Sequence, residues 1–321
     1  MRSIAILGSG GDSPGMNACL RAATRAAISR GWRIFGAYGG YQGLVDRKLV
    51  ELNSRSVSRI ISRGGCILGA GRCDSFLQHE VRAAAAAYLK EKGIDGLIVM
   101  GGDGSLRGAT ELHRLSLQVV TVPGTIDNDM VGTEITIGAD TAINTAMEAI
   151  DRLRDTAEAH HRAMIVEVMG RRSGYLAVMS GLSTGAEMII TPERPVELHD
   201  IFNEMRTDGD RGKRHFIIVL AEGARWRAPE LTQLINDAPN PYEARYTVLG
   251  YIQRGGSPSR FDRILATRMG VAAVDALAEG KSDALVCWRH NRVEVHPTES
   301  LQPQPSPWTE NLDRVHRIST T

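Results

Sequence analysis

The sequence predicts an α/β protein with largely parallel β-sheets that are covered by helices on both faces. Short, almost continuous apolar runs rich in Val, Ile and Leu recur along the chain, and most of them end in a glycine-bearing loop that leads into a helical stretch. The pattern returns in the second half of the chain, so we expect a second α/β unit there. A length of 321 residues also suggests about two domains.

Each expected element follows from this pattern. The apolar run IAIL (4–7) leads through GSGGDSPG into a helix over residues 16–29, and LIVM (97–100) leads through GGDGS into a helix over residues 106–115. Further strands are expected at residues 119–122, 164–168 and 216–220, and further helices after residue 139 and at residues 175–183. The polar stretch TDGDRGKRH (207–215) is expected to be a surface loop.

Charge and composition exclude several classes of protein. The 38 Lys and Arg residues nearly balance the 37 Asp and Glu residues, whereas proteins that bind nucleic acids or membrane surfaces usually carry a strong basic excess. No apolar run approaches the ~18 residues of a membrane span. The four scattered cysteines form neither a CxxC pair nor a disulfide framework, which predicts a reducing, cytoplasmic location.

The loop Gly8–Gly15 opens a helix and is the first candidate ligand site. Backbone N–H groups at a helix N-terminus favour phosphate. The loop differs from a Walker A loop because no Lys–Ser/Thr pair follows Gly15, and from G-x-G-x-x-G because Ser13 stands at the third glycine position. It therefore fits either a phosphate site or a tight turn that binds no ligand.

The loop Gly101–Ser105 indicates phosphoryl transfer from a nucleotide. Its glycines allow a nucleotide to approach the backbone closely. An aspartate beside a polyphosphate is favourable if Asp103 binds Mg²⁺, which takes one or two carboxylates together with phosphate oxygens.

The loop 124–129 places Asp127 and Asp129 two residues apart, so both side chains can face the same side of an extended loop. One carboxylate can accept the proton of a hydroxyl while the other stays near a metal ion, as phosphoryl transfer requires. An Asx-rich turn without catalytic function is the alternative interpretation.

Later stretches contribute charged groups. MGRRSG (169–174) and Glu222 each follow an apolar strand. Arg171, Arg245 and Arg254 are candidates to clamp a sugar phosphate, and Glu222 is a candidate for sugar hydroxyls. Taken singly, each arginine fits an ordinary solvated or ion-paired surface group.

In this order, the motifs resemble those of the ATP-dependent bacterial 6-phosphofructokinases from Ile4 to about Arg268, with a weaker match beyond residue 285. The motifs that carry the resemblance are GGDSPGMN (10–17), RGG (63–65), GGDGS (101–105), PGTIDND (123–129), GADTA (138–142), AIDRLRDTA (149–157), EVMGR (167–171), LAEG (220–223) and IQRGGSP (252–258).

The resemblance implies two similar three-layer α/β domains with the active-site cleft between them, in a homotetramer. A larger ATP-binding domain would take residues 1–138 and 251–305, and a smaller fructose-6-phosphate-binding domain would take residues 139–250 and 306–321. The implied reaction is the glycolytic phosphorylation of D-fructose 6-phosphate to fructose 1,6-bisphosphate, with ATP as co-substrate and Mg²⁺ as cofactor.

The resemblance also implies residue roles. Asp127 would take the proton of the fructose 1-hydroxyl, with Thr125, Arg171 and Arg72 completing the catalytic set. The metal ion would be held by Asp103 and Asp129. ATP would be bound by Gly11, Tyr41, Arg72, Cys73, Gly102, Asp103, Gly104, Ser105 and Gly108. Fructose 6-phosphate would be bound by Thr125, Ile126, Asp127, Met169, Gly170, Arg171, Glu222, Tyr251 and Arg254, with Arg162 and Arg245 reaching across from a neighbouring subunit.

The donor is indicated by two small residues, Gly104 and Gly124, which leave room for the α-phosphate of an adenine nucleotide. Pyrophosphate-dependent relatives carry Asp and Lys at these places, so ATP is favoured. Two residues depart from the family pattern. Tyr251 stands where many relatives place a histidine, and its phenol carries no positive charge; Cys73 replaces an aromatic residue beside the adenine.

Two alternatives remain open. The first is a pyrophosphate-dependent or broader sugar-phosphate kinase. The second, from a different class, is a catalytically silent phosphosugar-binding regulator, against which the presence of both Asp103 and Asp127 argues.

The resemblance finally implies an effector site between subunits, where ADP activates and phosphoenolpyruvate inhibits. Its matching residues are Arg21, Arg25, Arg154, Glu187, Arg211 and Lys213. Arg55 stands where an aromatic residue is usual, and Arg59 where an acid is usual. We therefore expect weak or absent activation by ADP and residual inhibition by phosphoenolpyruvate.

Overall fold

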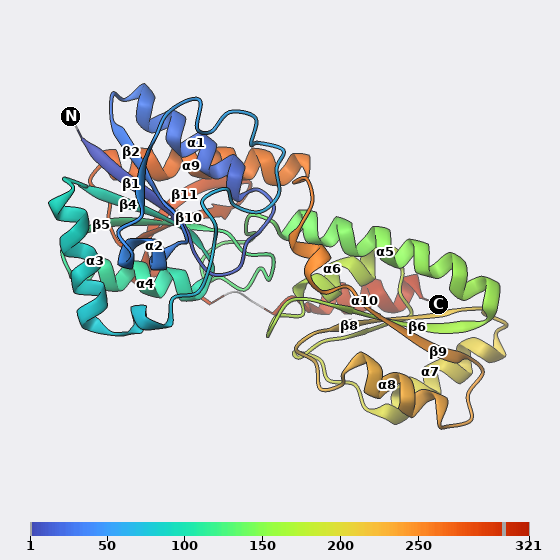
Figure 1. The fold of residues 1–321 in the computed structure, drawn as a ribbon. Helices are drawn as coiled ribbons and strands as arrows, with labels where there is room; N and C mark the ends of the chain where they lie inside the picture. The colour runs from blue at the N-terminus through green and yellow to red at the C-terminus, as the bar shows by residue number, and fades with distance from the viewer. Residues whose placement is uncertain (1, 304–305, 321) are drawn as a thin grey trace. The chain divides into compact units, whose positions relative to one another are not determined.

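The computed structural model describes residues 2–303 and 306–320 and divides the chain into two compact units (Figure 1). The first unit comprises Met1–Thr141 and Arg254–Gln304, and the second comprises Ala142–Gln253 and Pro305–Thr321. The chain therefore leaves the first unit, builds most of the second and returns. The expected assignment of one ligand to each domain stays a prediction, and residue 305, at one expected boundary, lies outside the described residues.

In the described part of the first unit, one seven-stranded sheet has the order β11-β10-β5-β4-β1-β2-β3. The strands are β1 (Ser3–Gly8), β2 (Arg33–Ala37), β3 (Leu49–Leu52), β4 (Gly96–Gly101), β5 (Gln118–Pro123), β10 (Ala284–Arg289) and β11 (Arg292–Pro297). The central strands pair in parallel, whereas β2–β3 and β10–β11 are antiparallel pairs at the two edges. The predicted central strands are confirmed.

Alternate residues of these central strands face opposite helical layers. Ile4 and Ile6 belong to the core under α1 (Met16–Ser29) and α9 (Arg260–Ala278). Ala5 and Leu7 belong to the core under α2 (Tyr41–Val45), α3 (His79–Glu91) and α4 (Asp103–Arg114). Figure 1 shows α1 and α9 on one face of the sheet and α3 and α4 on the other, which confirms the three-layer prediction. The short 3₁₀ helices of this unit are Asp74–Leu77 and Thr298–Ser300.

The second unit contains, in its described residues, a four-stranded parallel sheet in the order β7-β8-β6-β9. Its strands are β6 (Arg162–Val168), β7 (Met188–Ile190), β8 (Phe216–Ala221) and β9 (Glu243–Val248). Figure 1 shows α7 (Leu198–Asp210) and α8 (Ala228–Asn236) on one face, and α5 (Ala139–His160), α6 (Tyr175–Thr184) and α10 (Glu310–Ser319) on the other. A 3₁₀ turn, Gly250–Arg254, follows β9.

One predicted loop is partly wrong. The sequence predicts a surface loop over residues 207–215, but α7 continues through Asp210. The reason is Asp208, which is 1% exposed and accepts a hydrogen bond from Lys213 Nζ at 2.9 Å. This ion pair stabilises the last turn of α7, in a stretch whose polar composition alone predicts an exposed loop.

Candidate functional site

Three glycine-bearing loops lie at one edge of the first unit's sheet, after β1, β4 and β5. These strands are neighbours and run in parallel, so their carboxyl ends meet. From β1 the chain passes to β2 on one side and later to β4 on the other, so the strand order reverses beside β1. Ligands of open α/β sheets bind outside the strand ends at such a switch point.

Small residues let the three loops approach one another. Ser9 N–H donates to Met100 O at 2.8 Å, and Gly124 N–H donates to Gly101 O at 3.0 Å. A Cβ on Gly101 would lie 2.6 Å from Ser9 O, so any larger residue would separate the loops.

Asp103 is the first residue of α4, at the positive end of the helix dipole. Its carboxylate pairs with Arg107, one turn further along, whose Nε donates to Oδ2 at 3.1 Å. Gly104 is exposed, and no described atom outside its own helix backbone and chain neighbours lies within 4 Å of a Cβ placed on it. The carboxylate, the open glycine and the helix N-terminus form a set that suits a magnesium-bound phosphate.

The loop after β5 is braced from within. Asp127 is only 5% exposed, and its N–H donates to Thr125 Oγ1 at 3.2 Å. Asn128 adopts a left-handed conformation with φ +48°, and its Oδ1 accepts from Thr136 N–H at 2.8 Å while its Nδ2 donates to Glu134 O at 3.1 Å. The loop therefore fixes the backbone of Asp127, while Asp129 is exposed.

Sequence reasoning gave Asn128 no role. Its residue type was the available signal, because Asn tolerates the left-handed region better than most residues.

The two glycines expected to leave room for the nucleotide differ in their surroundings. Space is open at Gly104, whereas a Cβ on Gly124 would lie 2.9 Å from Met16 Cε of α1. The structure thus gives Gly124 a packing reason for its small size.

Tyr41 lies beneath the start of α4. It is 4% exposed, its hydroxyl donates to Ser105 O at 2.7 Å, and its ring stacks on Phe76 with centroids 4.2 Å apart. Burial raises the pKa of Tyr41. A Cβ on Gly108 would lie 2.9 Å from the tyrosine ring, so both residues support the loop that bears Ser105.

The segment before α3 lies against the first loop. Gly10 N–H donates to Gly71 O at 3.1 Å. The next residue, Arg72, is exposed, and Cys73 is half-buried with its Sγ 3.2 Å from Gln42 Oε1.

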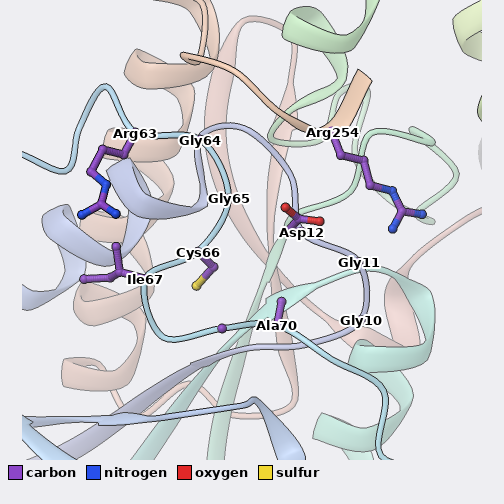
Figure 2. Close-up of a pocket in the computed structure, with 11 residues that line it drawn as sticks. Gly10, Gly11, Asp12, Arg63, Gly64, Gly65, Cys66, Ile67, Ala70 and Arg254 are labelled. Atoms are coloured by element: carbon purple, nitrogen blue, oxygen red, sulfur yellow. The ribbon is translucent and has the colours of Figure 1, made fainter. Parts of the chain in front are cut away.

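A pocket of about 470 Å³ opens beside the first loop (Figure 2). Figure 2 shows Arg63 and Arg254 on opposite sides of it, with Asp12 and Cys66 between them. A Cβ on Gly11 would lie 3.1 Å from Arg254 Nη1. Two guanidinium groups make the pocket suitable for an anion, and of its residues sequence reasoning assigned roles to Gly11 and Arg254 only.

Asn17 shapes one wall of this pocket. It is fully buried, donates to Arg63 O at 3.1 Å and Gly64 O at 3.0 Å, and accepts from Ile67 N–H at 2.8 Å. Its position as a polar residue among the apolar side chains of the first turn of α1 was the signal that could have revealed this role.

The second unit brings another predicted group together. Glu222 N–H donates to Val168 O at 2.8 Å, and Glu222 Oε2 accepts from Arg171 N–H at 3.2 Å. Met169 N–H donates to Oε1 of the buried Gln253 at 2.9 Å. The loops after β6 and β8 thus place Met169, Gly170, Arg171 and Glu222 in one cluster, and Gln253 is a brace that sequence reasoning missed.

The remaining predicted residues of this unit lie elsewhere. Arg162 and Arg245 both contact Glu243, with Arg162 Nε 3.1 Å from Glu243 Oε2. Arg162 begins β6 and Met169 follows its end, so about 20 Å of strand separates them. Tyr251 is 77% exposed in the 3₁₀ turn after β9.

Three of the predicted effector residues meet around a buried carboxylate. Lys213 Nζ lies 2.9 Å from Asp208 Oδ2, 3.5 Å from Glu187 Oε1 and 3.2 Å from Thr320 O. Arg211 Nη1 lies 3.7 Å from Asp208 Oδ1. Burial and these two carboxylates raise the pKa of Tyr242 to about 12. Sequence reasoning missed Asp208.

The other predicted effector residues belong to helices, and the contacts of the cluster do not include them. Arg154 donates to Thr184 O, whereas Arg21 and Arg25 belong to α1 in the first unit.

Two kinds of feature, a cluster of metal-binding side chains and a membrane-spanning helix, are absent from the described residues. No three His, Cys, Asp or Glu side chains in residues 2–303 and 306–320 are placed to bind a metal ion. In the same residues, no helix combines the length and apolar character needed to cross a membrane.

Comparison with known proteins matches residues 3–277 to the family model described as Phosphofructokinase. An ATP-dependent 6-phosphofructokinase from Thermotoga neapolitana is 49% identical over 321 residues, covering 99% of this chain and 100% of the relative. One from Clostridium acetobutylicum is 47% identical over 312 residues, covering 97% of each chain.

Solved structures are similar over the whole chain. The phosphofructokinase of Pichia pastoris matches with a TM-score of 0.89 and 36% identity, covering 99% of this chain and 36% of that one. This chain therefore spans about a third of the Pichia chain. A pyrophosphate-dependent phosphofructokinase from Marinobacter aquaeolei matches with a TM-score of 0.84 at 20% identity, covering 100% of this chain and 92% of that one, a likeness of fold.

Proposed function

Because this chain belongs to the phosphofructokinase family, we propose that it transfers the γ-phosphoryl group of ATP to D-fructose 6-phosphate and forms fructose 1,6-bisphosphate. Relatives 47–49% identical over nearly their whole length bear the name of that activity. The observation that carries the proposal is Asp127, a buried carboxylate on a braced loop that adjoins the open N-terminus of α4.

ATP binds over the loops 8–15 and 101–105 in this proposal. Amide groups at the start of α4 receive the phosphates together with the backbone of the exposed Gly11 and Gly104 and the half-exposed Gly102, since such groups favour anions. Arg72 and Cys73 lie on the adjoining segment, while Tyr41, Ser105 and Gly108 form the supporting layer described above.

Asp103 and Asp129 are the proposed magnesium ligands. Mg²⁺ needs only one or two carboxylates when phosphate oxygens supply the rest, so the two exposed or half-exposed acids suit it. The ion supplies charge neutralisation on the transferring phosphate.

The proton moves to Asp127. Its carboxylate accepts the proton of the fructose 1-hydroxyl, the sugar oxygen bonds to the γ-phosphorus, and the bond from that phosphorus to the bridging oxygen breaks to release ADP. Thr125, Arg171 and Arg72 stabilise the charge that develops during this transfer.

The proposed sugar-phosphate residues are Thr125, Ile126, Asp127, Met169, Gly170, Arg171, Glu222, Tyr251 and Arg254. Arg162 lies about a strand length from the Met169 loop of its own chain, and Arg245, which pairs with Met164 in β6, lies about 16 Å from it, so we assign both to the site of a neighbouring subunit. This assignment requires an oligomer, for which we propose a homotetramer.

ATP is the proposed donor rather than pyrophosphate. The open space at Gly104 supports this choice, as does the ATP-dependent naming of the most similar sequences. A pyrophosphate-dependent or broader sugar-phosphate kinase is the competing proposal, and Tyr251 in place of a cationic group favours the broader variant.

The effector site proposed at Glu187, Arg211 and Lys213, together with Arg21, Arg25 and Arg154, is partly neutralised by this chain itself. Asp208 and Glu187 place two carboxylates beside Lys213. We therefore expect compact anions such as phosphoenolpyruvate to bind weakly there. The four cysteines are free thiols in the described structure, which suits the proposed cytoplasmic location.

A coupled assay with fructose 6-phosphate, Mg²⁺ and either ATP or pyrophosphate tests the proposal. Asp127→Asn should lower kcat about 10²–10⁴-fold while leaving ATP binding nearly unchanged, because the carboxylate acts on the sugar hydroxyl. Asp237→Asn, an exposed acid after α8, is the control and should retain wild-type kcat. No turnover of wild type with ATP, or nearly full kcat in Asp127→Asn, would refute the proposal.

A further inference from the structure

Arg107 forms an ion pair with Asp103, whose carboxylate is a magnesium ligand in the proposed function. Both its Nε and its Nη2 donate to the same oxygen, Oδ2 of Asp103. The guanidinium side chain is 78% exposed and the carboxylate 40% exposed, and the pair spans one turn of α4. The contact therefore lies on the open side of the helix start, next to the empty space over Gly104.

This ion pair changes the charge that an incoming nucleotide meets. Asp103 alone would present a negative charge to a polyphosphate, whereas the paired side chains are together neutral. A bound magnesium ion is a second cation that competes with the guanidinium for the negative charge of Asp103. The ion pair is therefore weakened when magnesium-bound nucleotide binds and can stay closed when metal-free nucleotide binds.

We propose that Arg107 is a specificity-determining residue that sets how strongly nucleotide binding depends on Mg²⁺. In the ligand-free chain its guanidinium neutralises Asp103, and it releases that carboxylate to the metal ion. The inference rests on the proposed function, since it takes Asp103 to be a metal ligand.

The charge argument fixes the sign of two effects. In Arg107→Gln the carboxylate of Asp103 is unpaired. Affinity for magnesium-bound ATP should rise about twofold, because the competing cation is gone and an exposed pair at this spacing is weak. Affinity for metal-free ATP should fall about three- to tenfold, because a cation is lost beside the polyphosphate within a screening length. The ratio of the dissociation constant for metal-free ATP to that for magnesium-bound ATP should therefore rise about tenfold.

Two further variants separate charge from general effects on the helix. Arg107→Lys keeps the positive charge, so its ratio should stay within about twofold of wild type. Arg114→Gln is the matched control, because Arg114 lies on the same helix, pairs with Glu111 and is 68% exposed, but is about three turns from Asp103. Its ratio should equal that of wild type.

Isothermal titration calorimetry of the full chain measures both constants, with ATP in excess MgCl₂ and with ATP in EDTA at matched ionic strength. A rise of the ratio in Arg107→Gln alone supports the inference. The inference is overturned if the ratio in Arg107→Gln equals that in Arg114→Gln, or if the ratio rises as much in Arg107→Lys as in Arg107→Gln. If wild type binds magnesium-bound ATP, such a result leaves the proposed function standing; if wild type binds ATP in neither condition, both fall.

Discussion

Gly104→Asp perturbs nucleotide binding at a position where the fold itself has room. Gly104 is the second residue of α4 and is exposed, and the described structure holds no atom outside its own helix backbone and chain neighbours within 4 Å of a Cβ built there. In a helix, Gly is less favourable than Ala by roughly 0.5–1 kcal/mol, and Asp recovers part of that difference. An acid in the first helical turn is favoured by about 0.3–1 kcal/mol. The variant should therefore unfold at the wild-type temperature or above it.

Nucleotide affinity should move the other way. A carboxylate about 6 Å from a phosphate charge costs roughly 0.7 kcal/mol in water and about 3 kcal/mol at an effective dielectric constant of 20. These values correspond to a rise in the KM for ATP of about threefold to more than a hundredfold. The KM for fructose 6-phosphate should change much less, because the added charge lies in the nucleotide loop.

Steady-state kinetics with ATP and with pyrophosphate, together with thermal unfolding, check this prediction. Gly104→Ala is the control: it adds one methyl group without charge, so it should stabilise the helix and raise the KM for ATP less than Gly104→Asp. Unchanged ATP kinetics in a folded Gly104→Asp variant would refute the placement of the nucleotide over this glycine.

Three further predictions concern separate parts of the chain. Tyr251→His should lower the KM for fructose 6-phosphate at pH 6.5, where imidazole is partly charged, and less so at pH 8; an unchanged KM at pH 6.5 contradicts it. Asp262 is buried and accepts hydrogen bonds from Gly138 N–H and Thr141 N–H. Burial raises the pKa of its carboxyl from the ordinary 3.8 to about 6. The stability that this group contributes is therefore fully present below pH 4 and is lost as the pH rises through about 6. Asp262→Asn, which loses an acceptor, should cost about 1–3 kcal/mol in urea unfolding, more at pH 5 than at pH 7.5, and an equal cost at both pH values would rule this out. Initial rates should show weak or absent activation by ADP and partial inhibition by phosphoenolpyruvate, which strong ADP activation or complete insensitivity to phosphoenolpyruvate would disprove.

The central strands were predictable because they are buried on both faces. β1, β4 and β8 are buried throughout their length, and such strands appear in a sequence as unbroken apolar runs. β9 has the sequence EARYTV and is mostly exposed at the edge of its sheet. It therefore presents no run that distinguishes it from a loop, and its existence depends on pairing with β6.

The chemistry-bearing loops were predictable for a related reason. Glycines and carboxylates directly after buried strands indicate a ligand site whatever their exact contacts. The Asn and Gln side chains that brace those loops could not be predicted, because their hydrogen-bond partners are distant in sequence. Asn17 bonds to residues 46–50 positions away, and Gln253 to a residue 84 positions away.

The division between buried braces and exposed charges explains how one scaffold can be both fixed and adjustable. Asn17 and Asn128 are buried and bond the backbone from both ends of their amides, so each is costly to disturb. Asp103 and Arg107 form an exposed ion pair with each other, and an ion pair on the surface contributes little to stability. The backbone geometry of the site is thus set when the chain folds, whereas its charge is left to be set by what binds.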